Sequence, residues 1–168
     1  MKVNKILSDD LLHQLIPQAR ENPRRRINYN IHTGYEERVQ RFLNVLEYES
    51  YVRPHQHNKI NAWEGFVILK GKLCAHQFNE QGIIMHRTEL CENGPVFGIE
   101  LDSTRAHCIT SLSDHAIVFE YKEGPYDPVD DKNFSTWSPD PHSDEASQFT
   151  LWLKKARLGE KFTSNRKD

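Results

Sequence analysis

The sequence is poor in the features that mark several large classes of protein. Its 168 residues include only 3 cysteines, and no two of them form a Cys-x-x-Cys pair. This spacing argues against a disulfide framework, and we interpret Cys74, Cys91 and Cys108 as reduced thiols. No hydrophobic run approaches the roughly 20 residues that a membrane-spanning helix needs, and the first residues show no signal-peptide pattern. We therefore expect a cytoplasmic protein that does not interact with a membrane.

The chain also lacks an excess of charge of either sign. Lys and Arg number 22 against 24 Asp and Glu, which gives a formal net charge of −2. A balanced charge gives no electrostatic reason for a polyanionic partner, so we expect no binding to nucleic acid. Histidine, in contrast, is frequent for a chain of this length, with 9 residues. The useful question is whether some of these histidines have the spacing of metal ligands.

The distribution of apolar residues predicts one domain over 1–168, with a β-rich centre between two helices. The first helix is expected near 8–20, with Ser8 as its N-cap and a kink or an early end at Pro17. The second is expected near 143–158. Between them, at about 24–123, short β-branched and aromatic runs alternate with turn residues. We expect strands near 25–32, 38–47, 50–56, 64–70, 72–79, 83–90, 96–101, 106–112 and 115–122. Many short antiparallel strands without intervening helices indicate an all-β barrel or sandwich.

The strongest chemical signal is the pair His55 and His57. Residues two apart on a strand point to the same face, so both imidazoles can reach one ion inside a barrel. Glu64 begins the next strand, and His107 begins another strand far along the chain. Three histidines and a carboxylate are a suitable ligand set for a divalent transition metal.

These residues resemble the first motif of the cupin superfamily, G-x5-H-x-H-x(3–4)-E-x6-G. His55, His57, Glu64 and Gly71 match it, with six residues between Glu64 and Gly71. His107 matches the histidine of the second motif, P-x-G-x2-H-x3-N. The resemblance implies a cupin-type double-stranded β-helix, or jelly-roll barrel, with an N-terminal and a C-terminal helix. It also implies one metal ion held by the two histidines of the first motif, its glutamate and the histidine of the second.

The departures from the two motifs lie mostly in turns. Six residues separate His57 from Glu64, so the hairpin between them is longer than the motif expects. Glu49 stands in place of the first glycine, residues 102–104 replace P-x-G, and Ser111 replaces the final asparagine. Two alternatives therefore remain: a barrel that keeps its ligands without a metal, and a different carboxylate as the fourth ligand.

Further segments are similar to the WbuC family of cupin-fold metalloproteins over about residues 8–135. They are Asn28–His32, Val39–Asn44, the Pro-His-x-His site and Glu123–Pro128, in this order. Members of that family are often encoded with genes for O-antigen or capsule sugar biosynthesis. The resemblance implies a role in making surface polysaccharide, without naming a reaction.

Polar residues at two places are candidates for binding or catalysis. Arg26, Asn28 and Asn30 alternate with apolar residues, so this strand either has a solvated face or lines the barrel mouth and binds substrate. The run at 24–26 is likewise either solvated surface or a site for phosphate or carboxylate. Tyr126, in a Gly-Pro-Tyr-Asp-Pro turn, either acts on a substrate as a proton donor or packs its ring on the barrel end.

The ligand set leaves two positions of an octahedral ion open, and it suits Fe, Mn, Ni, Zn or Cu. We expect a metal-dependent enzyme that acts on a small polar substrate. The alternatives are a non-haem iron dioxygenase and a non-enzymatic module in which the metal anchors a small ligand. We also expect a homodimer, formed through an outer sheet face that carries Val67, Leu69 and Leu112.

Overall fold

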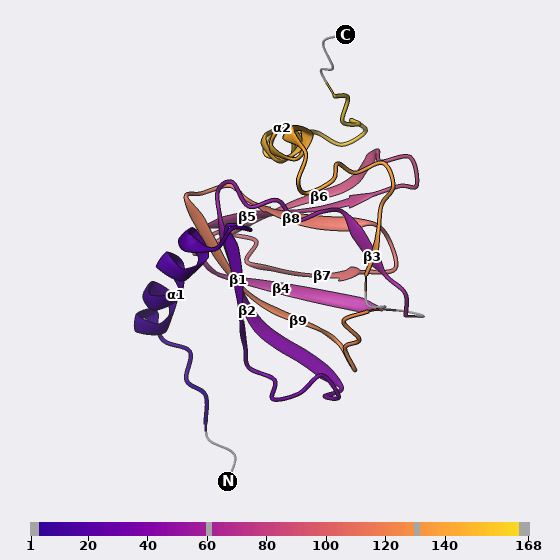
Figure 1. The fold of residues 1–168 in the computed structure, drawn as a ribbon. Coiled ribbons are helices and arrows are strands. Elements are labelled where there is room, and N and C mark those ends of the chain that lie inside the picture. Colours follow the sequence, from indigo (N-terminus) through magenta and orange to yellow (C-terminus); the bar gives the residue numbers. More distant parts are fainter. Residues whose placement is uncertain (1–3, 60–61, 130–131, 165–168) are drawn as a thin grey trace.

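The computed structural model describes residues 4–59, 62–129 and 132–164, which form two five-stranded antiparallel sheets and two helices (Figure 1). The first sheet has the order β1 (Arg26–Asn30), β2 (Val39–Glu47), β9 (His115–Glu123), β4 (Trp63–Lys70) and β7 (Gly98–Asp102). The second has the order β10 (Lys132–Phe134), β3 (His55–His57), β8 (His107–Ser111), β5 (Lys72–Phe78) and β6 (Ile84–Cys91). Neighbours that are distant in sequence, such as β2 and β9, confirm the expected all-β jelly-roll fold with a helix on each side of it.

An apolar cluster lies between the two sheets. Leu46 and Phe66 of the first sheet belong to it together with Leu73 and Ile109 of the second, and all four are buried. Along β4 the inward positions are Glu64, Phe66 and Ile68, as the alternation of a strand requires. Glu64, the polar residue of this row, therefore lies in the same interior as the apolar core.

Helix α1 (Asp9–Glu21) covers the outer face of the first sheet. The hydroxyl oxygen of Ser8 accepts a hydrogen bond from the backbone N–H of Leu11 at 3.3 Å, so the expected N-cap is present. Pro17 does not end the helix; it lies on the exposed side, and the expectation of an early end was wrong. Leu69 packs against the buried face of this helix, so it is not part of an open apolar surface.

Helix α2 (Asp144–Leu153) covers the outer face of the second sheet through buried residues that include Phe149. It is shorter than the expected 143–158. The backbone N–H of Lys155 donates to the carbonyl of Trp152 at 3.0 Å, which tightens the chain into a turn, and the Lys154 ammonium donates to the carbonyl of Tyr48 at 2.7 Å. The Lys154 side chain thus holds the chain after the helix to the barrel.

Two further expectations were wrong at the strand next to the candidate ligands. The strand expected at 50–56 is reduced to β3, because Pro54 offers no N–H and the carbonyl of Tyr51 accepts instead from the Arg26 side chain. Strand β10 was missed; its three residues pair with β3 and carry no periodic signal.

Gly71 connects β4 and β5 with a φ of +79°, a left-handed conformation that favours glycine. A Cβ atom there would also collide with the carbonyl oxygen of His115. The motif glycine therefore has a clear steric role in the turn. Within the ranges given above, no helix is both long and apolar enough to cross a membrane.

Candidate metal centre

Strand β3 presents His55 and His57 on one face, into the barrel. The two side chains are nearly closed to solvent, with 4% and 5% of their surface exposed. In the antiparallel pairing of β3 with β8, His55 lies directly opposite His107, which is 1% exposed. The two sequence motifs are thus neighbours in the second sheet, although about fifty residues of chain separate them.

Glu64 reaches the same place from the first sheet. It lies opposite Leu101 of β7 and Lys122 of β9, and only 2% of its surface is exposed. The next residue, Gly65, lies opposite Tyr121, whose ring occupies the space that a Cβ atom would need. This close packing holds the pairing of β4 with β9, so the longer hairpin before Glu64 does not turn its carboxylate outward.

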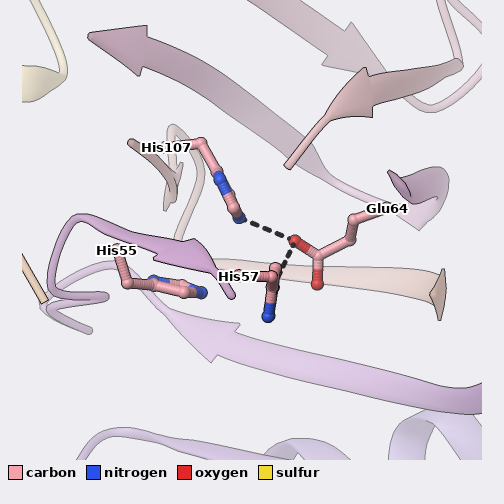
Figure 2. A group of neighbouring side chains, drawn as sticks. All are labelled: His55, His57, Glu64 and His107. Atoms are coloured by element: carbon pink, nitrogen blue, oxygen red, sulfur yellow. Dashed lines mark hydrogen bonds and ion pairs between the residues drawn. The ribbon is translucent and has the colours of Figure 1, made fainter. Parts of the chain in front are cut away.

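The four side chains converge on one point (Figure 2). The Nε2 atom of His107 lies 2.8 Å from Oε2 of Glu64, and the Nε2 atom of His57 lies 3.7 Å from the same oxygen. One candidate ligand atom from each of the four residues lies within 4.8 Å of every other. All four residues are buried, which sets the group apart from a cluster of charged surface side chains.

Hydrogen bonds at the far side of two rings orient the imidazoles. Nδ1 of His55 lies 2.9 Å from the carbonyl oxygen of Arg53, and Nδ1 of His107 lies 2.8 Å from that of Arg105. A carbonyl only accepts, so each Nδ1 carries the proton and donates it. Such bonds fix the ring and leave Nε2 as the atom that can bind a metal.

The Nε2 atom of His55 is the clearest sign that something further binds here. It is buried, and no hydrogen-bond partner for it exists in the described part of the chain. Burial, and next the positive charge of Lys132, hold the pKa of His55 well below its usual value. A neutral imidazole with a lone pair directed at two other imidazoles and a carboxylate fits a divalent transition ion.

A second carboxyl group lies beside Glu64. Burial, and next the Glu64 carboxylate, raise the pKa of Glu120 well above its usual value. Burial acts on Glu64 in the same direction, but the hydrogen bond with His107 and the nearby His57 outweigh it and hold the pKa of Glu64 well below normal. The lowered pKa favours the charged form of Glu64, and the raised pKa favours the neutral form of Glu120, which can donate a hydrogen bond to a carboxylate. The other Glu120 contact is a 2.8 Å hydrogen bond from Nδ2 of Asn44.

Three of the four residues, His55, Glu64 and His107, lie at the wall of a cavity of about 250 Å³. The residues proposed from sequence for substrate contact, Arg26, Asn28 and Asn30, all line it, as does Tyr126. Strand β1 is at the same time an edge strand, so its polar face is partly solvated and also lines the cavity. The ring of Tyr126 packs against that of Tyr35, with 5.1 Å between centroids.

The run at 24–26 divides between two roles. Arg25 points to the surface, where it lies 3.6 Å from Glu49 in an exposed ion pair. Arg24 is exposed but lines the cavity, and Arg26 is half-buried and lines it too. Arg24 and Arg25 are therefore solvated, and Arg24 and Arg26 line the cavity.

Sequence reasoning missed several residues of the cavity wall, namely Gln40, Asn44, Glu120 and Lys122. All four are buried polar residues on β2 and β9. The available signal was their spacing of two or four residues within otherwise apolar strands, which puts them on the inward face. It indicates burial, but it does not say that the two strands lie beside a metal centre.

Solved structures of other proteins share this architecture. An uncharacterized conserved protein with a double-stranded beta-helix domain from Klebsiella pneumoniae is similar over 80% of this chain and 97% of its own, with a TM-score of 0.55 and 13% identity. TT1209 from Thermus thermophilus is similar over 74% of this chain and 98% of its own, with a TM-score of 0.52 and 16% identity. An HTH_3 family transcriptional regulator from Vibrio cholerae matches 67% of this chain and 60% of its own, with a TM-score of 0.49 and 15% identity.

The two sheets and the similarity to the Klebsiella pneumoniae protein define a protein with the cupin fold, an all-β double-stranded β-helix flanked by two helices. By sequence, the chain belongs to the family described as a domain of unknown function (DUF6016), whose model matches residues 7–90. The matched segment contains His55, His57 and Glu64 but ends before His107. No curated protein sequence matches the chain significantly.

Proposed function

We propose that this protein binds one divalent transition metal ion through His55, His57, Glu64 and His107 and acts on a small polar molecule in the adjoining cavity. The observation that carries the proposal is the buried Nε2 atom of His55. It lacks a hydrogen-bond partner in the described ranges and lies within 4.8 Å of three other candidate ligand atoms. A bound ion supplies Lewis-acid chemistry, because it polarises an oxygen atom that coordinates to it.

The surrounding side chains would bind and orient the substrate. Arg26, Asn28 and Asn30 present donors along one wall, and Tyr126 places its phenol at the cavity. A phenol there can give a proton to a substrate oxygen. The Lys122 ammonium lies 4.8 Å from the centre of the Tyr126 ring, within cation–π distance, and so helps to hold the ring at the cavity.

The resemblance of the sequence to the WbuC family supports a finer proposal. Under it, the substrate is a sugar or a sugar derivative used in the synthesis of surface polysaccharide, and the protein is an enzyme of that pathway. Amide side chains such as Asn28, Asn30 and Asn44 are suited to bind hydroxyl groups, which agrees with a polyol or sugar.

Metal reconstitution followed by activity measurement tests the function. Chelator-treated protein is loaded separately with Fe(II), Mn(II), Ni(II), Zn(II) and Cu(II), and each form is assayed with a panel of sugars and sugar nucleotides. Turnover that requires the metal supports an enzyme, and oxygen uptake by the Fe(II) form alone identifies a dioxygenase. Metal-dependent ligand binding without turnover indicates a binding module. Failure of every ion to bind contradicts the proposal.

Glu120 should strengthen the metal site without contacting the ion, because its hydrogen bond orients the Glu64 carboxylate. We expect Glu120→Leu to weaken metal binding by about 10–100-fold, while Glu120→Gln, which keeps a donor, binds nearly as well as the native protein. Competition with a chromophoric chelator measures both dissociation constants. Glu100→Leu, at an exposed position of β7, is the control. Unchanged metal affinity in the Glu120→Leu protein would show that Glu120 does not support the site.

A further inference from the structure

Arg26 is a half-buried cation for which no acidic partner lies within ion-pair distance among the described side chains. Its Nη1 donates to the carbonyl of Tyr51 at 2.5 Å and contacts the Ser50 hydroxyl at 3.5 Å, and both partners are neutral. Removal of a charge from water is costly unless an opposite charge or several hydrogen bonds compensate it. The cost is visible in the pKa of Arg26, which burial, and next the neighbouring Arg24, lower to about 10.

The charges of the cavity wall are unbalanced in the same direction. Four cationic side chains line it, namely Arg24, Arg26, Lys122 and Lys132. Only two carboxyl groups oppose them among the described lining residues, Glu64 and Glu120, and of these Glu64 faces the metal centre. The cavity therefore has a positive potential, which attracts anions.

An unused acceptor lies on the same wall. Asn44 is 8% exposed, and its Nδ2 donates to Glu120, but its Oδ1 has no hydrogen-bond partner in the part of the chain that the structure describes. Asn44 lies directly opposite Asn28 in the pairing of β1 with β2, and Arg26 precedes Asn28 by two residues on the same face. A buried acceptor without a partner indicates a ligand that carries an O–H or N–H group.

The sheet order separates this wall from the metal centre. Glu64 lies on β4, and β9 and β2 lie between it and β1, which carries Arg26. Three strand spacings correspond to about 14 Å across the strands. The register adds an offset along them, because Arg26 pairs through Leu46 with Ala116 of β9 whereas Glu64 pairs with Lys122 of β9. Both side chains nevertheless line one cavity, so a single small molecule can contact both. The cavity of about 250 Å³ fits such a molecule.

We propose that the ligand of this cavity is a small organic acid or phosphate ester, whose oxyanion pairs with Arg26 while a neighbouring hydroxyl or amino group donates to Asn44. The other end of the ligand faces the metal centre. This assignment rests on the proposed function only in taking the cavity as the substrate site. The anion contact itself involves Arg26 and does not require a bound metal.

The test uses the full chain without metal and titrates it by calorimetry at constant ionic strength with inorganic phosphate, with glutarate, and with uncharged 1,5-pentanediol. We expect saturable binding of at least one anion and none of the diol. The stronger of the two anions identifies the group as phosphate or carboxylate. Absence of saturable binding by both anions, or equal binding of the diol, overturns the inference.

Substitutions test whether the anion binds at Arg26. Arg26→Gln should weaken anion binding by about tenfold or more, and Arg26→Lys should weaken it less because the charge remains. Asn28→Asp, at an exposed position, should also weaken binding because it supplies a competing carboxylate without disturbing the core. Arg105→Gln, an exposed arginine, is the control. Native affinity in both the Arg26→Gln and Asn28→Asp proteins overturns the assignment of the contact to Arg26.

The same proteins separate this inference from the proposed function. Anion binding with no metal binding would contradict the metal centre and leave the anion site standing. Metal binding with no anion binding would support the metal centre and contradict the anion site.

Discussion

The double variant His55→Ala/His57→Ala is expected to purify without stoichiometric metal. It removes two of four buried ligands, both on β3, and leaves a single histidine and Glu64. Loss of one residue that only supports a ligand typically weakens metal binding by about 10–100-fold, so the loss of two ligands should exceed that range. The barrel should persist, because the apolar cluster between the sheets contains neither histidine.

Elemental analysis of the native and variant proteins, both purified without chelators or an affinity metal, measures the effect. His86→Ala and His142→Ala change exposed histidines and control for the number of histidines in the chain. The native protein and both controls should carry about one equivalent of metal. Native metal content in the His55/His57 variant would contradict the assignment of the ligands.

Replacement of Phe149 by alanine should strongly destabilise the fold. The side chain is completely buried between α2 and the second sheet, and its ring packs 5.8 Å from that of Tyr51 and 5.1 Å from that of Phe162, measured between centroids. Truncation of a buried phenylalanine in a packed core typically costs about 3–5 kcal/mol in the free energy of unfolding. A loss of this size would show that α2 is an integral part of the barrel.

Urea denaturation followed by circular dichroism measures the change. Leu151→Ala is the matched control, because it shortens an aliphatic side chain on the same helix at a position that is 52% exposed. The control should change stability by no more than about 0.5 kcal/mol. Equal effects of the two substitutions would mean that α2 does not pack on the sheet as described.

The strand pattern was the part of the fold that sequence could predict well, because alternation along one strand is a local property. His55 and His57 share a face for that reason alone. The inward direction of Glu64 depends instead on the pairing of β4 with β9, which Gly65 and Tyr121 hold in place. That contact joins residues far apart in the chain, so the hairpin length by itself could not decide the direction.

The cavity wall likewise depends on contacts between residues far apart in the chain, which sequence patterns do not predict. Asn44 and Glu120 are recognisable in sequence as polar residues at inward positions, but their hydrogen bond joins β2 to β9. Helix α2 ends before the expected residue 158, where the Lys154 ammonium binds carbonyl groups of Tyr48 and Ser111 in the barrel. Both errors concern contacts that exist only after the sheets have closed.

X-ray absorption spectroscopy of the zinc-loaded protein tests the central claim most directly. The account predicts a first shell of nitrogen and oxygen at about 2.0–2.1 Å, with the multiple scattering of several imidazole rings and no sulfur. The three cysteines lie outside the cluster of candidate ligands, so they cannot contribute. A sulfur scatterer at about 2.3 Å, or a first shell without imidazole, would contradict a centre built from His55, His57, Glu64 and His107.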